Sequence, residues 1–205
     1  MKKTNWLFLT IACFLFLSFH LSAQTNRFNA GLIAGLNFSE LEGNEITDYF
    51  GLNVGLLGTA RLSEHHQLGM ELLFSQNGEY VLPEYYPRIS YGKVRLNHIE
   101  IPVHFDWLVR SFKRGNFYDW NLNIGLAYTR LLSYAAENAD QMDVSDQIIY
   151  EKKEAFLIQA GTIYYFTNKI GLNLKATLPI RKEGLSWTLA ARIIYLFNDN
   201  HSSSL

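Results

Sequence analysis

Residues 28–38 read FNAGLIAGLNF, and this stretch decides the fold because its side chains alternate in character one by one. The odd positions hold mainly asparagine and glycine, and the even positions hold the apolar residues Phe28, Ala30, Leu32, Ala34, Leu36 and Phe38. A period of two places the two sets on opposite faces of an extended chain. The stretch therefore predicts a β-strand with one apolar face and one polar, glycine-containing face.

The same alternation recurs in seven further segments, at residues 50–61, 68–75, 99–107, 118–128, 156–166, 170–180 and 187–197. Glycine falls on the polar face of nearly every segment, and tryptophan and tyrosine gather at the ends of the apolar face. Small residues inside and aromatic girdles outside are typical of a narrow membrane barrel, and eight strands enclose a lumen that side chains can fill. The pattern predicts an all-β fold, an eight-stranded antiparallel up-and-down transmembrane β-barrel.

A soluble, secreted eight-stranded barrel of the lipocalin kind would show the same alternation with its apolar face turned inward. Its polar face would then meet water, where repeated glycine would only weaken the strands. The crowded interior of a membrane barrel gives those glycines a purpose, so the membrane barrel is favoured.

The composition excludes several other classes of protein. Of the 205 residues, 48% are hydrophobic and 18% are charged, which excludes a disordered chain. The formal net charge is −1 and no cluster of lysine and arginine is present, so no nucleic acid is expected as a partner. Beyond the first residues no apolar run reaches 18 residues, which excludes a helical membrane protein.

Residues 1–23 predict a secretory signal peptide. Lys2 and Lys3 precede an apolar run over residues 6–19, and small residues follow up to Ala23, after which cleavage is expected. The run is shorter than the roughly 20 residues of a spanning helix. It also contains Cys13, the single cysteine of the chain, so no disulfide is expected in the mature protein.

The links between the expected strands alternate in length. Longer links cover residues 40–48, 77–97 and 131–153, with a shorter one at 181–185, and the short turns cover 63–66, 110–116 and 167–168. In outer-membrane barrels the long loops lie outside the cell and the short turns lie in the periplasm. The pattern predicts an outer-membrane barrel domain at residues 24–197 and a polar tail at 198–205, with both termini in the periplasm of a Gram-negative bacterium.

Four stretches resemble a known family: GLIAGLNFS at 31–39, FGLNVG at 50–55, ELLFSQNG at 71–78 and LNHIEIPV at 96–103. In this order and spacing they resemble the PorT-like outer-membrane β-barrel proteins of Bacteroidetes-type bacteria. The most specific is the segment ending in Pro102, because proline is unusual within a central strand. Asn77-Gly78 departs from the Lys-Gly expected in the family.

This resemblance covers nearly the whole mature chain and implies an outer-membrane location and a barrel fold. The family has no common reaction, so the resemblance implies no catalytic residues. One namesake member is associated with protein-secretion machinery, a role that the resemblance alone does not transfer to this chain.

Seven charged residues lie on the polar faces of the expected strands or at their ends: Arg61, Glu71, Glu100, Asp106, Asp119, Lys175 and Arg192. An unpaired charge inside a narrow lumen costs several kcal/mol, so near-equal numbers of opposite charges predict a structural lumen charge network. A proton or ion path is the alternative, which is disfavoured because eight strands leave no open channel.

The histidines offer weak candidates for a metal or catalytic site. His98 and His104 share one face of a strand with Glu100 between them, but six residues separate them by about 20 Å, too far for one metal ion. His65 and His66 are expected to be solvated residues of a turn. No metal and no cofactor are predicted.

An enzymatic role is not predicted. Ser75, Ser90, Ser133 and His98 lie near the expected outer leaflet, as a lipid-modifying enzyme would require, but no nucleophile motif surrounds them. The link at 131–153 is acidic, yet its spacing lacks the pattern of a calcium loop, so a solvated loop is expected.

The long links are the expected place for partners, because loops carry function on rigid barrels. Their aromatic candidates for contact are Tyr85, Tyr86, Tyr91 and Tyr134. Tyr195 and Phe197 end the last strand and resemble an assembly signal read by the outer-membrane assembly machinery. The expected partners are that machinery, membrane lipid and lipopolysaccharide, and an envelope protein bound through the long links.

The function expected from the sequence is that of a small outer-membrane barrel with a structural or interaction-mediating role, not an open porin. Two alternatives stay open: a subunit of an envelope or protein-secretion assembly, and a lipid-modifying outer-membrane enzyme.

Overall fold

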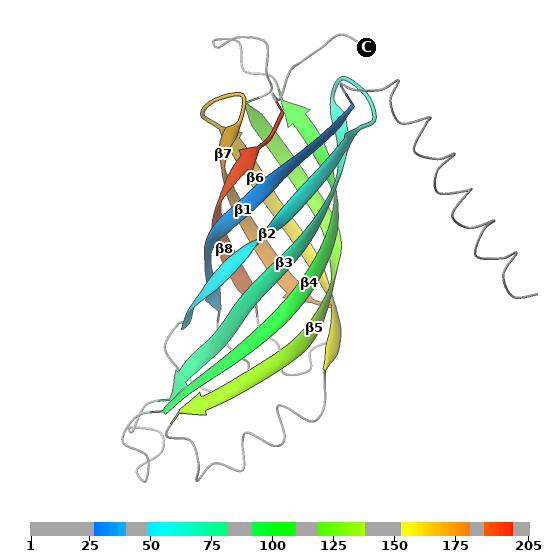
Figure 1. Ribbon diagram of the computed structural model, residues 1–205. Helices are drawn as coiled ribbons and strands as arrows, with labels where there is room; N and C mark the ends of the chain where they lie inside the picture. The colour runs from blue at the N-terminus through cyan, green and yellow to red at the C-terminus, as the bar shows by residue number, and fades with distance from the viewer. Residues whose placement is uncertain are drawn as a thin grey trace, which may run out of the picture.

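The computed structural model describes residues 27–39, 49–81, 92–109, 119–137, 153–180 and 187–198. Within them eight strands form one closed antiparallel barrel in which each strand pairs with the next and β8 pairs with β1 (Figure 1). The strands are β1 Phe28–Ser39, β2 Tyr49–Arg61, β3 His66–Val81, β4 Gly92–Val109, β5 Trp120–Glu137, β6 Glu154–Tyr165, β7 Ile170–Pro179 and β8 Thr188–Leu196. The predicted fold class is confirmed.

The described part of the chain contains no helix that is long and apolar enough to cross a membrane. The predicted signal peptide at residues 1–23 and the tail beyond residue 198 lie outside the described residues.

The barrel has two ends, which differ in their connections. We call the end where β1 begins and β8 finishes the terminal end, and the opposite end the loop end. At the terminal end β2 joins β3, β4 joins β5 and β6 joins β7; the other four connections leave from the loop end. Figure 1 shows this arrangement, with the start of β1 and the end of β8 side by side.

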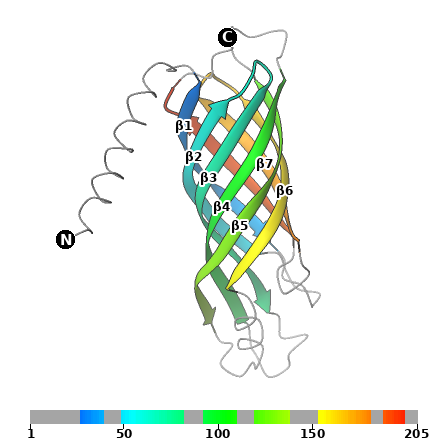
Figure 2. The same cartoon turned by 90° about the vertical axis from the view of Figure 1, so that its right-hand side faces the viewer.

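Three strands are longer than the alternation predicts, so the predicted link boundaries at residues 77 and 97, and at 131, were wrong. β3 runs on to Val81, β4 begins at Gly92 and β5 continues to Glu137. Along the extensions of β3 and β5 apolar and polar residues no longer alternate one by one, so the period of two is lost. Figures 1 and 2 show β3, β4 and β5 projecting beyond the other strands at the loop end.

The apolar faces point outward and the polar faces point into the barrel. On β5, for example, Ile124 is 62% exposed whereas its neighbour Asn123 is only 6% exposed. A soluble barrel would bury the first and expose the second. The observed orientation is that of a membrane barrel, with lipid rather than water as the outer solvent.

Inward-facing glycines allow the strands to approach closely. A Cβ atom placed on Gly35 in β1 would lie 2.2 Å from the Ala191 carbonyl oxygen of β8. On β3, a Cβ atom on Gly69 would lie 2.1 Å from the ring of His104. These two glycines therefore make room for a neighbouring backbone and for a buried imidazole.

Aromatic side chains gather at both ends of the outer surface. At the terminal end they include Trp107, Trp120, Tyr164, Phe166, Tyr195 and Phe197. Nearer the loop end, Tyr128 and Phe156 pack with ring centroids 5.7 Å apart, and Phe38 packs on Phe50 at 4.8 Å. Two aromatic belts are typical of a barrel anchored at both membrane interfaces.

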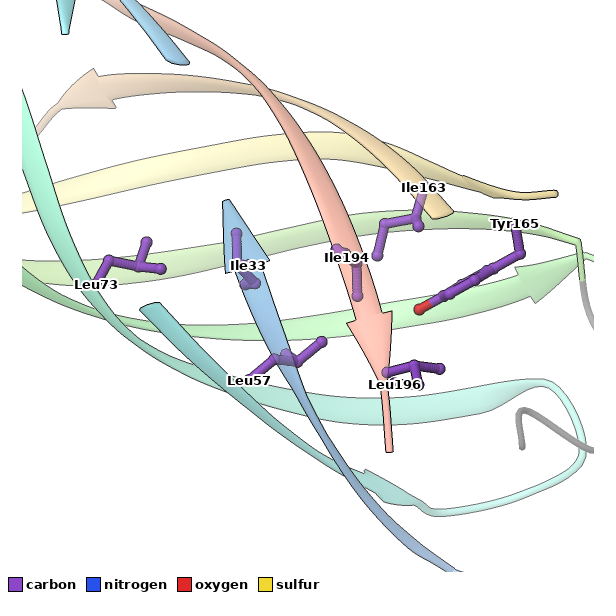
Figure 3. Close-up of a cluster of buried hydrophobic side chains, with 7 residues drawn as sticks. All are labelled: Ile33, Leu57, Leu73, Ile163, Tyr165, Ile194 and Leu196. Atoms are coloured by element: carbon purple, nitrogen blue, oxygen red, sulfur yellow. The ribbon is translucent and has the colours of Figure 1, made fainter. Parts of the chain in front are cut away.

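An apolar cluster lies inside the barrel, mainly in its terminal half. It consists of Ile33, Leu57, Leu73, Ile163, Tyr165, Ile194 and Leu196. Figure 3 shows these side chains, which come from β1, β2, β3, β6 and β8. Packing of these side chains fills this part of the lumen.

Candidate functional site

The middle of the lumen is occupied by one carboxylate held by two cations. Glu71 projects from β3, and Lys175 Nζ of β7 lies 3.0 Å from both of its carboxylate oxygens. From β8, Arg192 Nη1 donates to Glu71 Oε2 at 2.8 Å and Nη2 donates to Oε1 at 3.1 Å. The three residues are 3%, 4% and 1% exposed, so this ion cluster is shielded from water.

Polar side chains extend the ion cluster across the barrel. The Arg192 guanidinium also donates to Asn173 Oδ1, from Nε at 2.9 Å. On the other side of Glu71, His104 Nε2 lies 3.3 Å from Oε1, and His104 Nδ1 lies 2.5 Å from Asp106 Oδ1. The charge-assisted bonds of Lys175 and Arg192 with Glu71 join β7 and β8 to β3 across the lumen.

A glutamine completes the chain of contacts at its far end. Gln67 Nε2 donates to Asp106 Oδ2 at 3.0 Å, so both carboxylate oxygens of Asp106 have a partner. The network therefore runs from β7 and β8 through Glu71 and His104 to Asp106 and Gln67. The contact of His104 Nε2 with Glu71 lacks hydrogen-bond geometry, so it joins the two halves of this network less firmly than the other contacts do.

The seven charged residues singled out from the sequence are all buried, but they do not form a single cluster. Glu71, Lys175 and Arg192 meet directly, and Asp106 joins them through His104. Glu100 instead accepts a hydrogen bond from the Ser75 hydroxyl. The other two lie towards the terminal end, Arg61 as the last residue of β2 and Asp119 directly before β5.

The sequence analysis did not assign three members of the network to it: Gln67, His104 and Asn173. All three side chains face the lumen. Because every second residue of a strand faces the same side, the alternating pattern could have identified them. His66, placed in the turn by the sequence analysis, is instead the first residue of β3. Its ring lies 5.3 Å from that of Phe105, because pairing of β3 with β4 begins at this residue.

Among the described residues no group of three or more His, Cys, Asp and Glu side chains is arranged to hold a metal ion. His98 and His104 are both buried, His98 nearer the loop end and His104 beside Glu71. Ser75 accepts a hydrogen bond from Asn37 Nδ2 at 2.7 Å, whereas the Nδ1 atom of the neighbouring His98 has no hydrogen-bond partner among the described residues.

A polar cavity, which we call the vestibule, lies between the ion cluster and the loop end. The space enclosed in it is about 20 Å³, enough for one or two water molecules. Leu73, Lys175 and Arg192 line it on the side of the ion cluster, and His98 and Glu100 lie in its wall. The vestibule is thus a small polar cavity inside the barrel, of a size that suits water.

The candidate contact and assembly residues lie on the outer surface where the structure describes them. Tyr134 is 48% exposed, but it belongs to β5 rather than to a loop, because β5 continues past the predicted strand end. Tyr195 and Phe197 are exposed on the outer face at the terminal end, with ring centroids 6.2 Å apart. The remaining candidates, Tyr85, Tyr86, Tyr91 and Ser90, lie outside the described residues.

Fold and lumen together define a closed barrel with a lipid-facing apolar surface. The family model of the outer membrane protein beta-barrel domain matches residues 22–202, and the chain belongs to this family. It is therefore an outer-membrane barrel protein.

Comparison with curated proteins gives no match. Solved structures of similar fold include Ail, the attachment invasion locus protein of Yersinia pestis, at 8% identity and a TM-score of 0.48, covering 83% of this chain and 99% of Ail. OprG from Pseudomonas aeruginosa has 10% identity and a TM-score of 0.43, with 82% and 90% covered. Neisserial surface protein A has 12% identity and a TM-score of 0.43, with 82% and 96% covered.

Proposed function

We propose that this protein is a closed outer-membrane barrel with a structural or interaction-mediating role, not an open porin. The observation that carries the proposal is the filled lumen. The ion cluster of Glu71, Lys175 and Arg192 bridges opposite sides of the barrel, and the apolar cluster occupies the terminal half. Both would have to move before a continuous water path could form.

Planar-bilayer recording tests this closed state. Because the lumen is filled at two levels, the purified protein is expected to show no large, steady conductance steps. As a control, a porin reconstituted in the same lipid reports that insertion is efficient. Reproducible porin-like steps from this protein, persisting after repurification, would contradict the closed barrel.

The projecting part of β3, β4 and β5 supports an interaction role. β5 pairs with β6 only as far as Arg130, with one further bond from Leu131 N to Lys153 O at 2.8 Å. The register with β4 then shifts at Leu132, which is 57% exposed, as is typical of a β-bulge. Among the described residues no strand pairs with this edge of β5 beyond Leu131, and such an edge favours addition of a strand from a partner.

Photocrosslinking tests the edge of β5. A photoreactive amino acid at Tyr134 is expected to give a discrete protein adduct in intact cells, since this side chain lies on the part of β5 with which no described strand pairs on the β6 side. The matched control carries the same group at Met70, which is 59% exposed but faces lipid on β3. Failure to obtain a protein adduct specific to position 134 would argue against the edge as a docking surface.

The finer assignments from sequence fit this proposal. We propose that the loop end faces outside the cell and that both termini lie in the periplasm, which agrees with the two shortest connections, residues 62–65 and 166–169, lying at the terminal end. The PorT-like resemblance makes a subunit of an envelope or secretion assembly the alternative function, and a stable complex isolated in mild detergent would favour it. No described contact supports a lipid-modifying enzyme, the second alternative.

The end of β8 bears on assembly, and we propose that Tyr195 and Phe197 are read by the outer-membrane assembly machinery. Replacing both with aspartate is expected to abolish insertion, because charges then replace the aromatic pair on the lipid-facing surface. Deleting residues 199–205 should be tolerated, since Asn198, which bonds with Asn29, is retained. Membrane fractionation with heat-modifiable gel migration measures both; a folded double variant in the outer membrane would refute the assignment.

A further inference from the structure

The vestibule is small and mainly polar. The space enclosed in it is about 20 Å³, whereas roughly 10–15 Å³ is enough to hold one water molecule. Its lining includes the polar side chains of Asn53, Ser75, Thr129 and Gln159. The size of the vestibule therefore limits an occupant to one or two water molecules or a single small ion.

Four buried polar atoms around the vestibule have no hydrogen-bond partner among the described residues. They are Asn53 Oδ1 from β2, His98 Nδ1 from β4, Thr129 Oγ1 from β5 and Gln159 Nε2 from β6. Each of these side chains is more than nine-tenths buried. Buried polar groups are hydrogen-bonded in nearly all native structures, so four unpaired atoms around one cavity indicate an occupant that bonds with them.

The unpaired atoms include both acceptors and donors. Asn53 Nδ2 donates to Asn37 Oδ1 at 3.0 Å, which identifies the unpaired Asn53 Oδ1 as an acceptor. Gln159 Nε2 is a donor, and the Thr129 hydroxyl is both. Asn53 Oδ1 would repel an anion, and a cation would be repelled by Gln159 Nε2 and by Lys175, which also lines the vestibule. Water donates and accepts, so it is the small occupant that satisfies the whole set.

We propose that one or two internal water molecules occupy the vestibule and bond with Asn53, His98, Thr129 and Gln159. A buried water makes about three hydrogen bonds, so two waters are sufficient for the four atoms. The ion cluster joins β3 to β7 and β8, whereas these four atoms belong to β2, β4, β5 and β6. The waters therefore connect strands that the ion cluster does not join. This inference goes beyond the proposed function, because the ion cluster and the apolar cluster close the lumen with or without these waters.

Water–protein NMR on the refolded chain in detergent micelles tests the site directly. The side-chain amide protons of Gln159 and Asn53 are expected to show cross-relaxation with water of the sign found within the protein, because enclosed waters tumble with the barrel. The matched control is the Asn173 amide, which is equally buried but does not line the vestibule. Asn173 Nδ2 donates to the Thr162 carbonyl oxygen at 3.0 Å and its Oδ1 accepts from Arg192 Nε at 2.9 Å, so it should show no water signal.

The sign of a stability change provides an independent test. Thr129→Val replaces the hydroxyl with a methyl group of similar size. If the hydroxyl bonds with water, the substitution should raise the equilibrium constant for unfolding about fivefold, as loss of one hydrogen bond does. If the hydroxyl were left unpaired, its removal would stabilise the barrel instead. Gln159→Leu is expected to have the same destabilising effect and serves as the second variant.

Three results would overturn the proposal. The first is the absence of a water signal at both Gln159 and Asn53. The second is increased stability in both Thr129→Val and Gln159→Leu. The third is a saturable shift of the Gln159 and Asn53 amide signals when chloride is added to a chloride-free sample, which would identify an anion as the occupant.

Discussion

Replacing Glu71 with glutamine is expected to destabilise the barrel by about 3–5 kcal/mol, the usual cost of removing one partner of a buried ion pair. The substitution keeps the shape of the side chain but leaves Lys175 and Arg192 buried without their shared carboxylate. Unfolding in urea, followed by tryptophan fluorescence and by heat-modifiable gel migration, measures the change in free energy.

An exposed ion pair provides the control for the Glu71 experiment. Glu154 lies 3.8 Å from Arg130 and both side chains are more than half exposed, so Glu154→Gln should change stability by less than about 1 kcal/mol. Replacing Glu71, Lys175 and Arg192 together with leucine should recover much of the loss, because the ion cluster is then removed whole and none of its three charges is left without its partner. Equal unfolding midpoints for the Glu71 and Glu154 variants would show that the lumen cluster does not hold the barrel together.

The contrast between these residues shows what the sequence could and could not predict. The alternation along each strand assigns Glu71, Lys175 and Arg192 to the polar face, because residues two positions apart in a strand lie on the same face. The alternation does not predict the position of a side chain along the barrel axis, nor which strands face each other across the lumen. Glu71 on β3 meets residues of β7 and β8 only through the stagger of the closed sheet, which no local pattern encodes.

The strand ends were predicted poorly for a related physical reason. Alternation is visible only while one face meets lipid and the other meets the lumen. Past Ser75 the residues of β3 are mainly polar, and past Thr129 the pairs Leu131-Leu132 and Ala135-Ala136 break the alternation of β5, so backbone pairing alone defines these strand ends. The same limit hid Tyr134 in an expected loop, although it lies on the projecting part of β5.

Closure of the barrel between β1 and β8 depends on Gly35. The substitution Gly35→Ala is expected to lower the stability of the barrel about as much as the loss of a buried charge. The added Cβ would lie 2.2 Å from the Ala191 carbonyl oxygen and 2.5 Å from the Arg192 Cα. Both are backbone atoms of β8, so β1 and β8 must separate rather than a flexible side chain give way. Because Gly35 is paired with Arg192, separation at this point also pulls Arg192 away from Glu71.

Gly58→Ala is the matched control for this substitution, since it adds the same methyl group to a strand of the same barrel. The nearest atom to a Cβ at Gly58 is the Met70 carbonyl oxygen at 3.9 Å, an ordinary contact. We expect Gly35→Ala to cost about 3 kcal/mol, at the upper end of overpacking effects, and Gly58→Ala to leave the urea midpoint unchanged or slightly raised. If the two alanine variants unfold at the same urea concentration, close approach at the β1 and β8 seam is not what requires glycine at position 35.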